Sequence, residues 1–180
     1  MFGFLNIGDQ ISTTAGNLTI AGAPMVGGEG AGYKATLNGK AVFYKQFTDL
    51  QVLPPGFVSH DEIATHRHKR TEWLVKAQLN LLSPAFNAPF ASSTNPKKPG
   101  YVCAWMDGLT PWSDWRELAH PYGERLSVIG QLTNLLNLLH QRGIAHGDVN
   151  ANNVCLLGNG VNLQDRKSTR LNSSHDQRSR

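Results

Sequence analysis

The sequence predicts an α+β fold, and three observations carry this prediction. Alternating apolar and polar residues with a two-residue turn signal, Asn38-Gly39, indicate strands in the first part of the chain. Apolar residues at three- and four-residue steps between positions 126 and 139 indicate a long helix. Two short apolar runs around Gly158 and Gly160 indicate a second hairpin. Strands with one helix, then helices, then a hairpin are typical of an α+β domain.

The first half is expected to hold most of the strands. Residues 3–22 carry Gly8 and Gly16 and predict short strands and a turn, and 36–47 predict a hairpin. The segment 48–58 contains two prolines and a glycine and is expected to be a loop. Ser59 and Glu62 match a capping box that opens a helix reaching Leu82. Its expected inner face comprises Leu74, Ala77, Gln78 and Leu81, and Pro84 ends it.

The second half is expected to be mainly helical. Residues 85–91 and 101–106 read as strands separated by a turn-rich loop. A short helix should follow, capped by Ser113, and then the leucine-rich helix, ended near Gly143.

Length and composition limit the function classes. The chain has 180 residues, enough for one domain, and 40% of them are apolar. No apolar run approaches the roughly 20 residues needed to cross a bilayer, and the start lacks the pattern of an export signal. Two cysteines, Cys103 and Cys155, do not make a disulfide framework. We therefore expect a cytoplasmic protein with reduced thiols, no membrane contact in this segment and an undetermined oligomeric state.

The basic charge comes mostly from the last sixteen residues. The formal net charge is +4 and the pI about 9.2. The segment 165–175, DRKSTRLNSSH, resembles the in-frame translation of a common sequencing adapter, so we interpret 165–180 as an artefactual tail. Without it the chain carries 12 basic and 11 acidic groups, a net charge of +1. This removes the main argument for a nucleic-acid partner, and it implies a gene cut short.

The stretch 144–157, IAHGDVNANNVCLL, resembles the catalytic loop of protein kinases, H-R-D-L-x-x-x-N. The resemblance implies that Asp148 accepts the proton of the substrate hydroxyl and that Asn153 holds a magnesium ion. The preceding LTNLLNLLHQRG matches the apolar helix that leads into that loop. Two residues depart from the pattern. Gly147 replaces the arginine that clamps a phosphorylated activation loop, and Asn150 replaces the lysine that steadies the transferring phosphate.

The segment 25–35, MVGGEGAGYKA, resembles a glycine-rich phosphate loop. Two registers are possible: one led by Gly28 and Gly30, and a preferred one with Gly27 and Gly30 as its second and third glycines. Gly32 then stands where a valine normally packs over adenine. AVFYK resembles V-A-I-K, which makes Lys45 the lysine of the α- and β-phosphates. Glu62 and Glu72 compete for the helix carboxylate that pairs with it, and Glu72 is favoured because loops vary in length more than the helix does.

YVCAWMDG resembles the strand and hinge that hold adenine. The resemblance places Cys103 at the gatekeeper position, Ala104 to Met106 at the hinge, and Cys155 on the floor of the adenine site. VNLQD resembles the strand before D-F-G, which makes Asp165 a second magnesium ligand, although the adapter also supplies an Asp there.

Together these motifs, from about Ile20 to Leu163, identify residues 1–164 as part of a protein kinase-like domain. Residues 1–106 would form the β-rich N-terminal lobe with its long helix and hinge, and 107–164 the start of the helical C-terminal lobe. The implied reaction uses ATP and Mg²⁺ and transfers the γ-phosphate to Ser or Thr of a protein substrate. We expect this chain by itself to be inactive, because the activation segment and the remaining helices are missing.

Two alternatives stay open. A small-molecule phosphotransferase of the aminoglycoside-kinase type is favoured by Gly147, because those enzymes share H-G-D-x-x-x-x-N, and opposed by Asn150 and the GGEGA segment. A non-catalytic pseudokinase is favoured by Met25, Gly147 and Asn150, and opposed by intact Lys45, Asp148 and Asn153.

Overall fold

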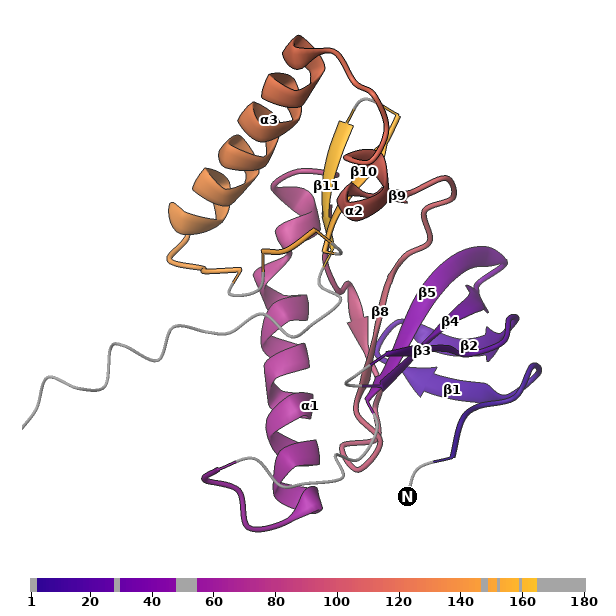
Figure 1. The fold of residues 1–180 in the computed structure, drawn as a ribbon. Coiled ribbons are helices and arrows are strands. Elements are labelled where there is room, and N and C mark those ends of the chain that lie inside the picture. Colours follow the sequence, from indigo (N-terminus) through magenta and orange to yellow (C-terminus); the bar gives the residue numbers. More distant parts are fainter. Residues whose placement is uncertain are drawn as a thin grey trace, which may run out of the picture. The chain divides into compact units, whose positions relative to one another are not determined.

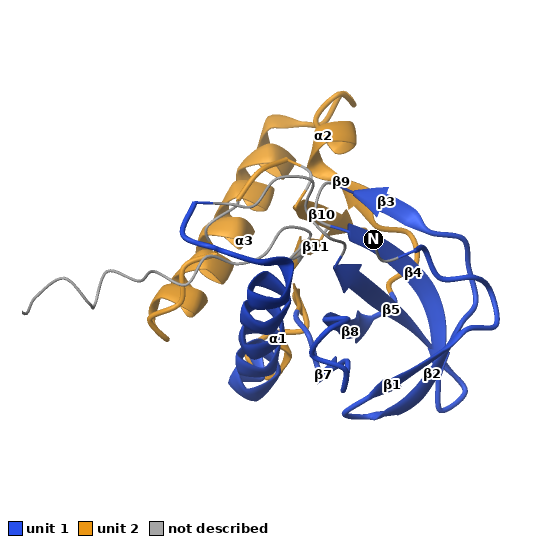
Figure 2. Cartoon of the chain, turned by 90° about the horizontal axis from the view of Figure 1, so that it is seen from below, with its two compact units in different colours: residues 1–79, 88–105 blue, residues 80–87, 106–180 orange. Residues whose placement is uncertain are grey.

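The computed structural model of the chain describes residues 3–27, 30–47, 55–146, 149–151, 153–158 and 160–164. They form two compact units (Figure 2). Unit 1 comprises residues 1–79 and 88–105, and unit 2 comprises residues 80–87 and 106–180. No helix in the described ranges is both long and apolar enough to cross a bilayer.

Unit 1 is built on a seven-stranded antiparallel sheet (Figure 1). Its strand order is β1-β2-β4-β5-β8-β7, and β3 pairs with β4 as a branch. The strands are β1 (Gln10–Thr13), β2 (Gly16–Ile20), β3 (Met25–Gly27), β4 (Gly30–Leu37), β5 (Lys40–Phe47), β7 (Ala91–Ser92) and β8 (Gly100–Ala104). A bridge from Thr13 to Ser93 joins the two edges, so the sheet closes on itself around an apolar core.

The predicted hairpin at Asn38-Gly39 is confirmed. These two residues connect β4 and β5 with positive φ angles of 50° and 76°. Two successive left-handed residues define the hairpin turn whose twist matches that of the strands. The turn fixes the register of β4 against β5, and it thereby sets which residue lies opposite Lys45.

Helix α1 (His60–Ala77) begins as predicted but ends early. Ser59 accepts a hydrogen bond from the Glu62 N–H, at 3.2 Å, while the Glu62 carboxylate accepts from the Val58 N–H, at 2.9 Å. The prediction that the helix reaches Leu82 is wrong, because Gln78 takes a left-handed conformation and Leu79–Leu81 form a separate 3-10 turn, η1. Of the expected inner face, Leu74 is buried, whereas Gln78 and Leu81 are exposed.

Unit 2 contains a four-stranded sheet, β6-β11-β10-β9, with helix α3 packed against β11. Its elements are β6 (Phe86–Asn87), β9 (Thr110–Pro111), α2 (Trp112–Trp115), α3 (Tyr122–His140), β10 (Val154–Leu157) and β11 (Gly160–Gln164). The predicted hairpin of β10 and β11 and the leucine-rich helix are confirmed. Gly143, with a φ of 69°, lies in the turn after α3.

Two further predictions about local structure are wrong. The expected strand 85–91 is divided into β6 and β7, which belong to different sheets. Pro89 lies between them and has no N–H to continue a ladder. Ser113 does not cap α2: Pro111 is the cap residue, and the Ser113 hydroxyl donates to the Asp114 carboxylate instead.

A helix glycine offers a way to stabilise unit 2. Gly130 lies on the exposed side of α3, and a Cβ added there meets no atom within 4 Å. We predict that Gly130→Ala raises the free energy of unfolding by about 1 kcal/mol, because alanine loses less backbone entropy in a helix. Chemical unfolding followed by circular dichroism measures this. Gly123→Ala, in the first turn of α3, is the control and should gain less. An unchanged or lower unfolding free energy for Gly130→Ala would contradict the prediction.

Tyr44 makes the stability of unit 1 sensitive to alkaline pH. Its side chain is 1% exposed inside the closed sheet, and burial raises the pKa of its hydroxyl well above the usual 10.0, against the opposing effect of a hydrogen bond with Ser93. The unfolded chain therefore loses this proton first, and unfolding becomes easier as the pH rises above 10. One such proton changes the free energy of unfolding by up to about 1.4 kcal/mol per pH unit.

We predict that Tyr44→Phe makes the loss of stability above pH 10 less steep. Urea unfolding at a series of alkaline pH values provides the measurement. Tyr122→Phe is the matched control, because Tyr122 is 75% exposed. Equal slopes for the wild type and Tyr44→Phe would show that Tyr44 does not control this pH dependence.

Candidate functional site

Lys45 lies on a buried strand rather than at an exposed strand end. Its side chain is 7% exposed, and β5 places it between Gly32 of β4 and Tyr101 of β8. Phe43 lies two residues before Lys45 on β5, and Phe47 lies two residues after it. Because side chains alternate along a strand, all three share one face of the sheet. Because negative charge nearby stabilises a buried ammonium, this position suits an anionic ligand.

The glycine-rich segment lies directly over this ammonium group. Gly27 ends β3 and pairs with Gly30, which begins β4. A Cβ added to Gly27 would lie 3.7 Å from the Gly30 carbonyl oxygen and 3.9 Å from Lys45 Nζ. Gly28, which follows Gly27 in the sequence, lies outside the described residues. Of the predicted phosphate-binding residues, Gly27, Gly30 and Lys45 are therefore close together.

Helix α1 contacts β7 and β8 and turns Ile63, Ala64, Thr71 and Leu74 inward. The Glu72 carboxylate is 45% exposed and lies 3.6 Å from His68 Nε2 on the same helix. The Arg67 guanidinium lies 5.0 Å from the centre of the Phe47 ring, beside the strand of Lys45. A pairing of Lys45 with Glu72 or Glu62 stays a prediction.

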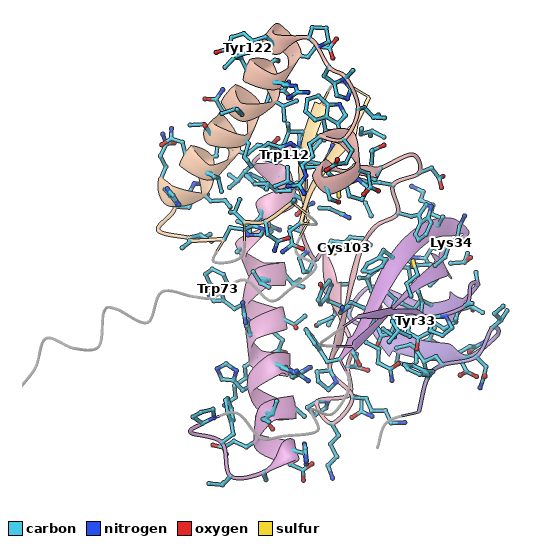
Figure 3. All side chains as sticks on the ribbon, in the orientation of Figure 1. Tyr33, Lys34, Trp73, Cys103, Trp112 and Tyr122 are labelled. Atoms are coloured by element: carbon cyan, nitrogen blue, oxygen red, sulfur yellow. The ribbon has the colours of Figure 1, made fainter. Side chains whose placement is uncertain are left out.

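The predicted hinge follows β8. Cys103 lies on this strand (Figure 3). It is 2% exposed and pairs with Phe43 of β5. Ala104 is exposed, and half-buried Met106 belongs to unit 2. Sequence reasoning missed a contact here: Lys34 Nζ lies 4.9 Å from the centre of the Trp105 ring. This cation–π contact fastens β4 to the start of the hinge segment.

In unit 2, the predicted catalytic loop is described in part. Asp148 and Gly147 lie outside the described residues, and so does Asp165. Asn153 is 2% exposed, and its backbone N–H and that of Val154 both donate to the Asn150 carbonyl, at 3.0 and 3.1 Å. This tight turn fixes Asn153 immediately before β10, where Cys155 is fully buried.

His146 is a second buried polar residue of this loop. It is 6% exposed, and neither ring nitrogen has a hydrogen-bond partner among the described residues. No cluster of three or more His, Cys, Asp or Glu side chains suited to a metal ion occurs in the described ranges. Asn153 is the predicted metal ligand that the structure does describe, and its amide oxygen is a donor type that Mg²⁺ accepts.

Sequence reasoning also missed a cavity of about 400 Å³ within unit 2. It lies between α2, α3 and the loop before β10, and its wall is mainly apolar, with Trp112, Trp115, Ile129, Val149 and Val154. Asn150, the residue that replaces the kinase lysine, contributes a polar edge. Spacing alone could not reveal this cavity, although the two tryptophans three positions apart on one short helix were a signal.

The leucines of α3 are better covered than the sequence suggests. Leu132, Leu135 and Leu139 are buried within unit 2, while Leu126 and Ile129 are 49% and 48% exposed. The exposed apolar surface of this helix therefore lies in its first half.

Sequence comparisons identify no relatives: no protein-family model matches the chain, and no curated protein does. Solved structures do match. The PknI kinase domain of Mycobacterium tuberculosis superposes with a TM-score of 0.66 and 18% identity, over 90% of this chain and 61% of that domain. A second crystal structure of the same domain gives the same TM-score and identity over 91% and 62%. The chain thus spans about three fifths of the length of these kinase domains. The predicted fold class is confirmed: the chain has a protein kinase-like fold, with a β-rich N-terminal lobe and part of a helical lobe.

Proposed function

We propose that this chain is the nucleotide-binding part of an ATP-dependent protein kinase that phosphorylates serine or threonine. The observation that carries the proposal is the buried Lys45 ammonium 3.9 Å from the Cβ position of Gly27. A cation under a glycine turn fits the triphosphate of a nucleotide, because small residues allow backbone N–H groups to approach phosphate oxygens closely. The kinase-like fold and the residues that resemble kinase motifs support the same assignment.

Each site residue has a proposed role in phosphoryl transfer. Gly27, Gly28 and Gly30 bind the phosphates through the backbone, and Lys45 holds the α- and β-phosphates, steadied by Glu72. Asp148 orients the acceptor hydroxyl and takes its proton. Asn153 and Asp165 would hold Mg²⁺, and bound Mg²⁺-ATP supplies the γ-phosphoryl group and neutralises its charge. The tight turn at Asn150 serves catalysis by positioning, since no covalent intermediate is needed.

The base is proposed to lie against unit 1 and the hinge. Cys103 would set the depth of the site, Ala104 and Met106 would offer backbone groups to the edge of the base, and Cys155 would form the floor. Side-chain identity at the hinge matters little when backbone groups make the hydrogen bonds.

The acceptor is proposed to be a protein, and the compartment the cytoplasm. The two crystal structures compared above are of the kinase domain of a protein called PknI, and the chain covers 61% of the first of them. Nucleotide binding is therefore proposed for this chain, and transfer for the whole domain.

Titration with ATP tests the binding step. We expect calorimetry of the wild-type chain to show ATP binding that tightens when Mg²⁺ is added, and no measurable turnover.

The longest protein encoded by the gene should then be assayed with peptides containing serine, threonine or tyrosine, and with an aminoglycoside. Transfer to Ser and Thr peptides supports the proposal. Transfer to the aminoglycoside alone supports a small-molecule phosphotransferase, and ATP binding without any transfer supports a pseudokinase. Absence of ATP binding refutes the proposed kinase and the small-molecule phosphotransferase, since both require the nucleotide.

A further inference from the structure

The cavity of about 400 Å³ in unit 2 has no assigned part in the proposed transfer reaction. The residues that line it come from α2, α3 and the segment that leads into β10, all within unit 2. Neither Lys45 nor Asn153 is among them. Small-molecule sites usually have volumes of about 300–1,000 Å³. The cavity is therefore large enough to hold a ligand of its own.

Printed contacts are not needed from a ligand to hold the walls of this cavity together, because the protein ties them itself. The Ser113 N–H of α2 donates to the Ala151 carbonyl of the segment before β10, at 3.0 Å. Trp115 stacks on the His120 ring, with 3.9 Å between the ring centroids and 15° between the ring planes. His120 Nδ1 in turn lies 3.1 Å from the Glu124 carboxylate of α3. A ligand therefore meets walls that are already in place, which lowers the cost of binding.

Most of the wall is apolar, and two of its side chains are indole rings. Trp112 and Trp115 are both half-buried, so part of each ring stays accessible. The remaining apolar wall is aliphatic and comprises Ile129, Val149 and Val154. Aromatic rings gain free energy from contact with other aromatic rings beyond the burial of apolar area. This composition favours a flat apolar ligand.

Two arginines give the cavity a positive rim. Arg116, which follows α2, and Arg125 of α3 both line it and are both exposed. Arg125 Nε donates to the His120 carbonyl, at 3.3 Å, and Arg116 Nε donates to the Glu117 carboxylate, at 3.2 Å. Most N–H donors of a guanidinium lie on its terminal amino groups rather than on Nε, so both arginines keep donors for a ligand. Among the described residues, the wall includes no acidic side chain. The rim therefore suits a carboxylate, which can accept two parallel hydrogen bonds from one guanidinium.

We propose that this cavity binds a small aromatic carboxylate, with its ring against the two indoles and its carboxylate on Arg125. Arg125 is favoured over Arg116 as the anchor because the Glu117 carboxylate already compensates the charge of Arg116. The inference goes beyond the proposed function and does not depend on the nucleotide site. It makes two demands that can be tested separately, a negative charge on the ligand and an open cavity.

The charge is tested by calorimetry of the full chain with naphthoate and with naphthylmethanol, which has the same ring system and no charge. We expect Arg125→Gln to weaken naphthoate binding by about fivefold, the upper end of what an exposed ion pair contributes. Its affinity for naphthylmethanol should not change. Arg142→Gln is the matched control, because Arg142 is exposed just after α3 and does not line the cavity. This variant removes the same charge and should bind naphthoate within about twofold of the wild type.

The open cavity is tested by a variant that fills it. Ile129→Trp adds a large ring to the wall at a position that is 48% exposed, where a larger side chain can be accommodated. It should weaken the binding of both ligands by about tenfold or more. Leu126→Trp is the control, since Leu126 is 49% exposed on the same helix and is not part of the wall. It should bind both ligands as the wild type does, and thermal unfolding checks that each variant is folded.

Several outcomes would overturn the inference. Naphthoate affinity in Arg125→Gln equal to that of the wild type would show that the rim does not hold the carboxylate. Unchanged binding by Ile129→Trp would place the ligand elsewhere. Naphthoate binding by this chain but not by the longest protein encoded by the gene would mean that the rest of the protein fills the cavity. If the wild type binds ATP but not naphthoate, the proposed function stands and this inference alone fails.

Discussion

Lys45→Met is expected to weaken ATP binding by about thirtyfold. Methionine retains an unbranched apolar side chain of similar length but has no charge and no N–H donor. A hydrogen bond to a charged group contributes about 2 kcal/mol, which corresponds to this change in affinity. The loss should reach this value because the Lys45 ammonium is buried, where an ion pair is only weakly screened by water. Isothermal titration with ATP in the presence of Mg²⁺ provides the measurement.

The same strand offers a matched control. Lys40 begins β5 and is exposed, so Lys40→Met removes an identical charge from the chain without touching the buried face. ATP affinity should then stay within about twofold of the wild type, because exposed charges are screened. An equal loss of affinity in both variants would mean that overall charge, and not the position of Lys45, governs binding. An unchanged affinity in Lys45→Met would remove the main support for the nucleotide site.

The proximity of Gly27, Gly30 and Lys45 could be predicted because the chain segments between them are short and their turns are set by local sequence. Asn38-Gly39 demands two left-handed residues, and this turn alone sets Lys45 opposite Gly32. Gly27 and Gly30 could be associated with Lys45 because a hairpin brings nearby segments of the chain together. For these three residues, sequence spacing was a good guide to distance in space.

Elements whose limits depend on tertiary contacts could not be predicted in the same way. Helix α1 ends at Ala77 because Gln78 takes a left-handed conformation. Glycine is the usual sequence signal of such a helix end, and this position holds glutamine instead. The division of 85–91 between two sheets depends on partners far away in the sequence: β6 pairs with β11, and β7 with β8. Local propensity contains no information about such partners.

The packing of Phe43 against Gly32 shows the same limitation within unit 1. The sequence shows only that Gly32 lacks the valine side chain of the kinase motif. Only the register of β4 against β5 shows that an aromatic ring from the neighbouring strand fills the space. The volume that the missing side chain of Gly32 leaves on β4 is filled by the Phe43 ring of β5.

Gly30→Ala is expected to destabilise unit 1 by about 3 kcal/mol or more, within the range of severe single substitutions. A Cβ at residue 30 would overlap the Gln46 carbonyl oxygen and would lie 3.0 Å from Phe47 Cα. Both atoms belong to the backbone, so no side-chain rotation can relieve the overlap. The strands must separate at this point, which breaks the pairing of Gly30 with Phe47 and loosens β5 next to Lys45. Chemical unfolding measures the stability, and ATP titration should show a parallel loss of affinity.

Gly160→Ala is the matched control, since Gly160 also begins a strand but has ordinary space around it. A Cβ there would lie 3.5 Å from the Leu157 carbonyl oxygen, a normal contact distance. We expect its free energy of unfolding to stay within about 1 kcal/mol of the wild type. If Gly30→Ala is as stable as Gly160→Ala, β4 and β5 are not as close at the glycine turn as described. If Gly30→Ala is unstable but binds ATP normally at a temperature where it is folded, the turn serves the fold and not the phosphates.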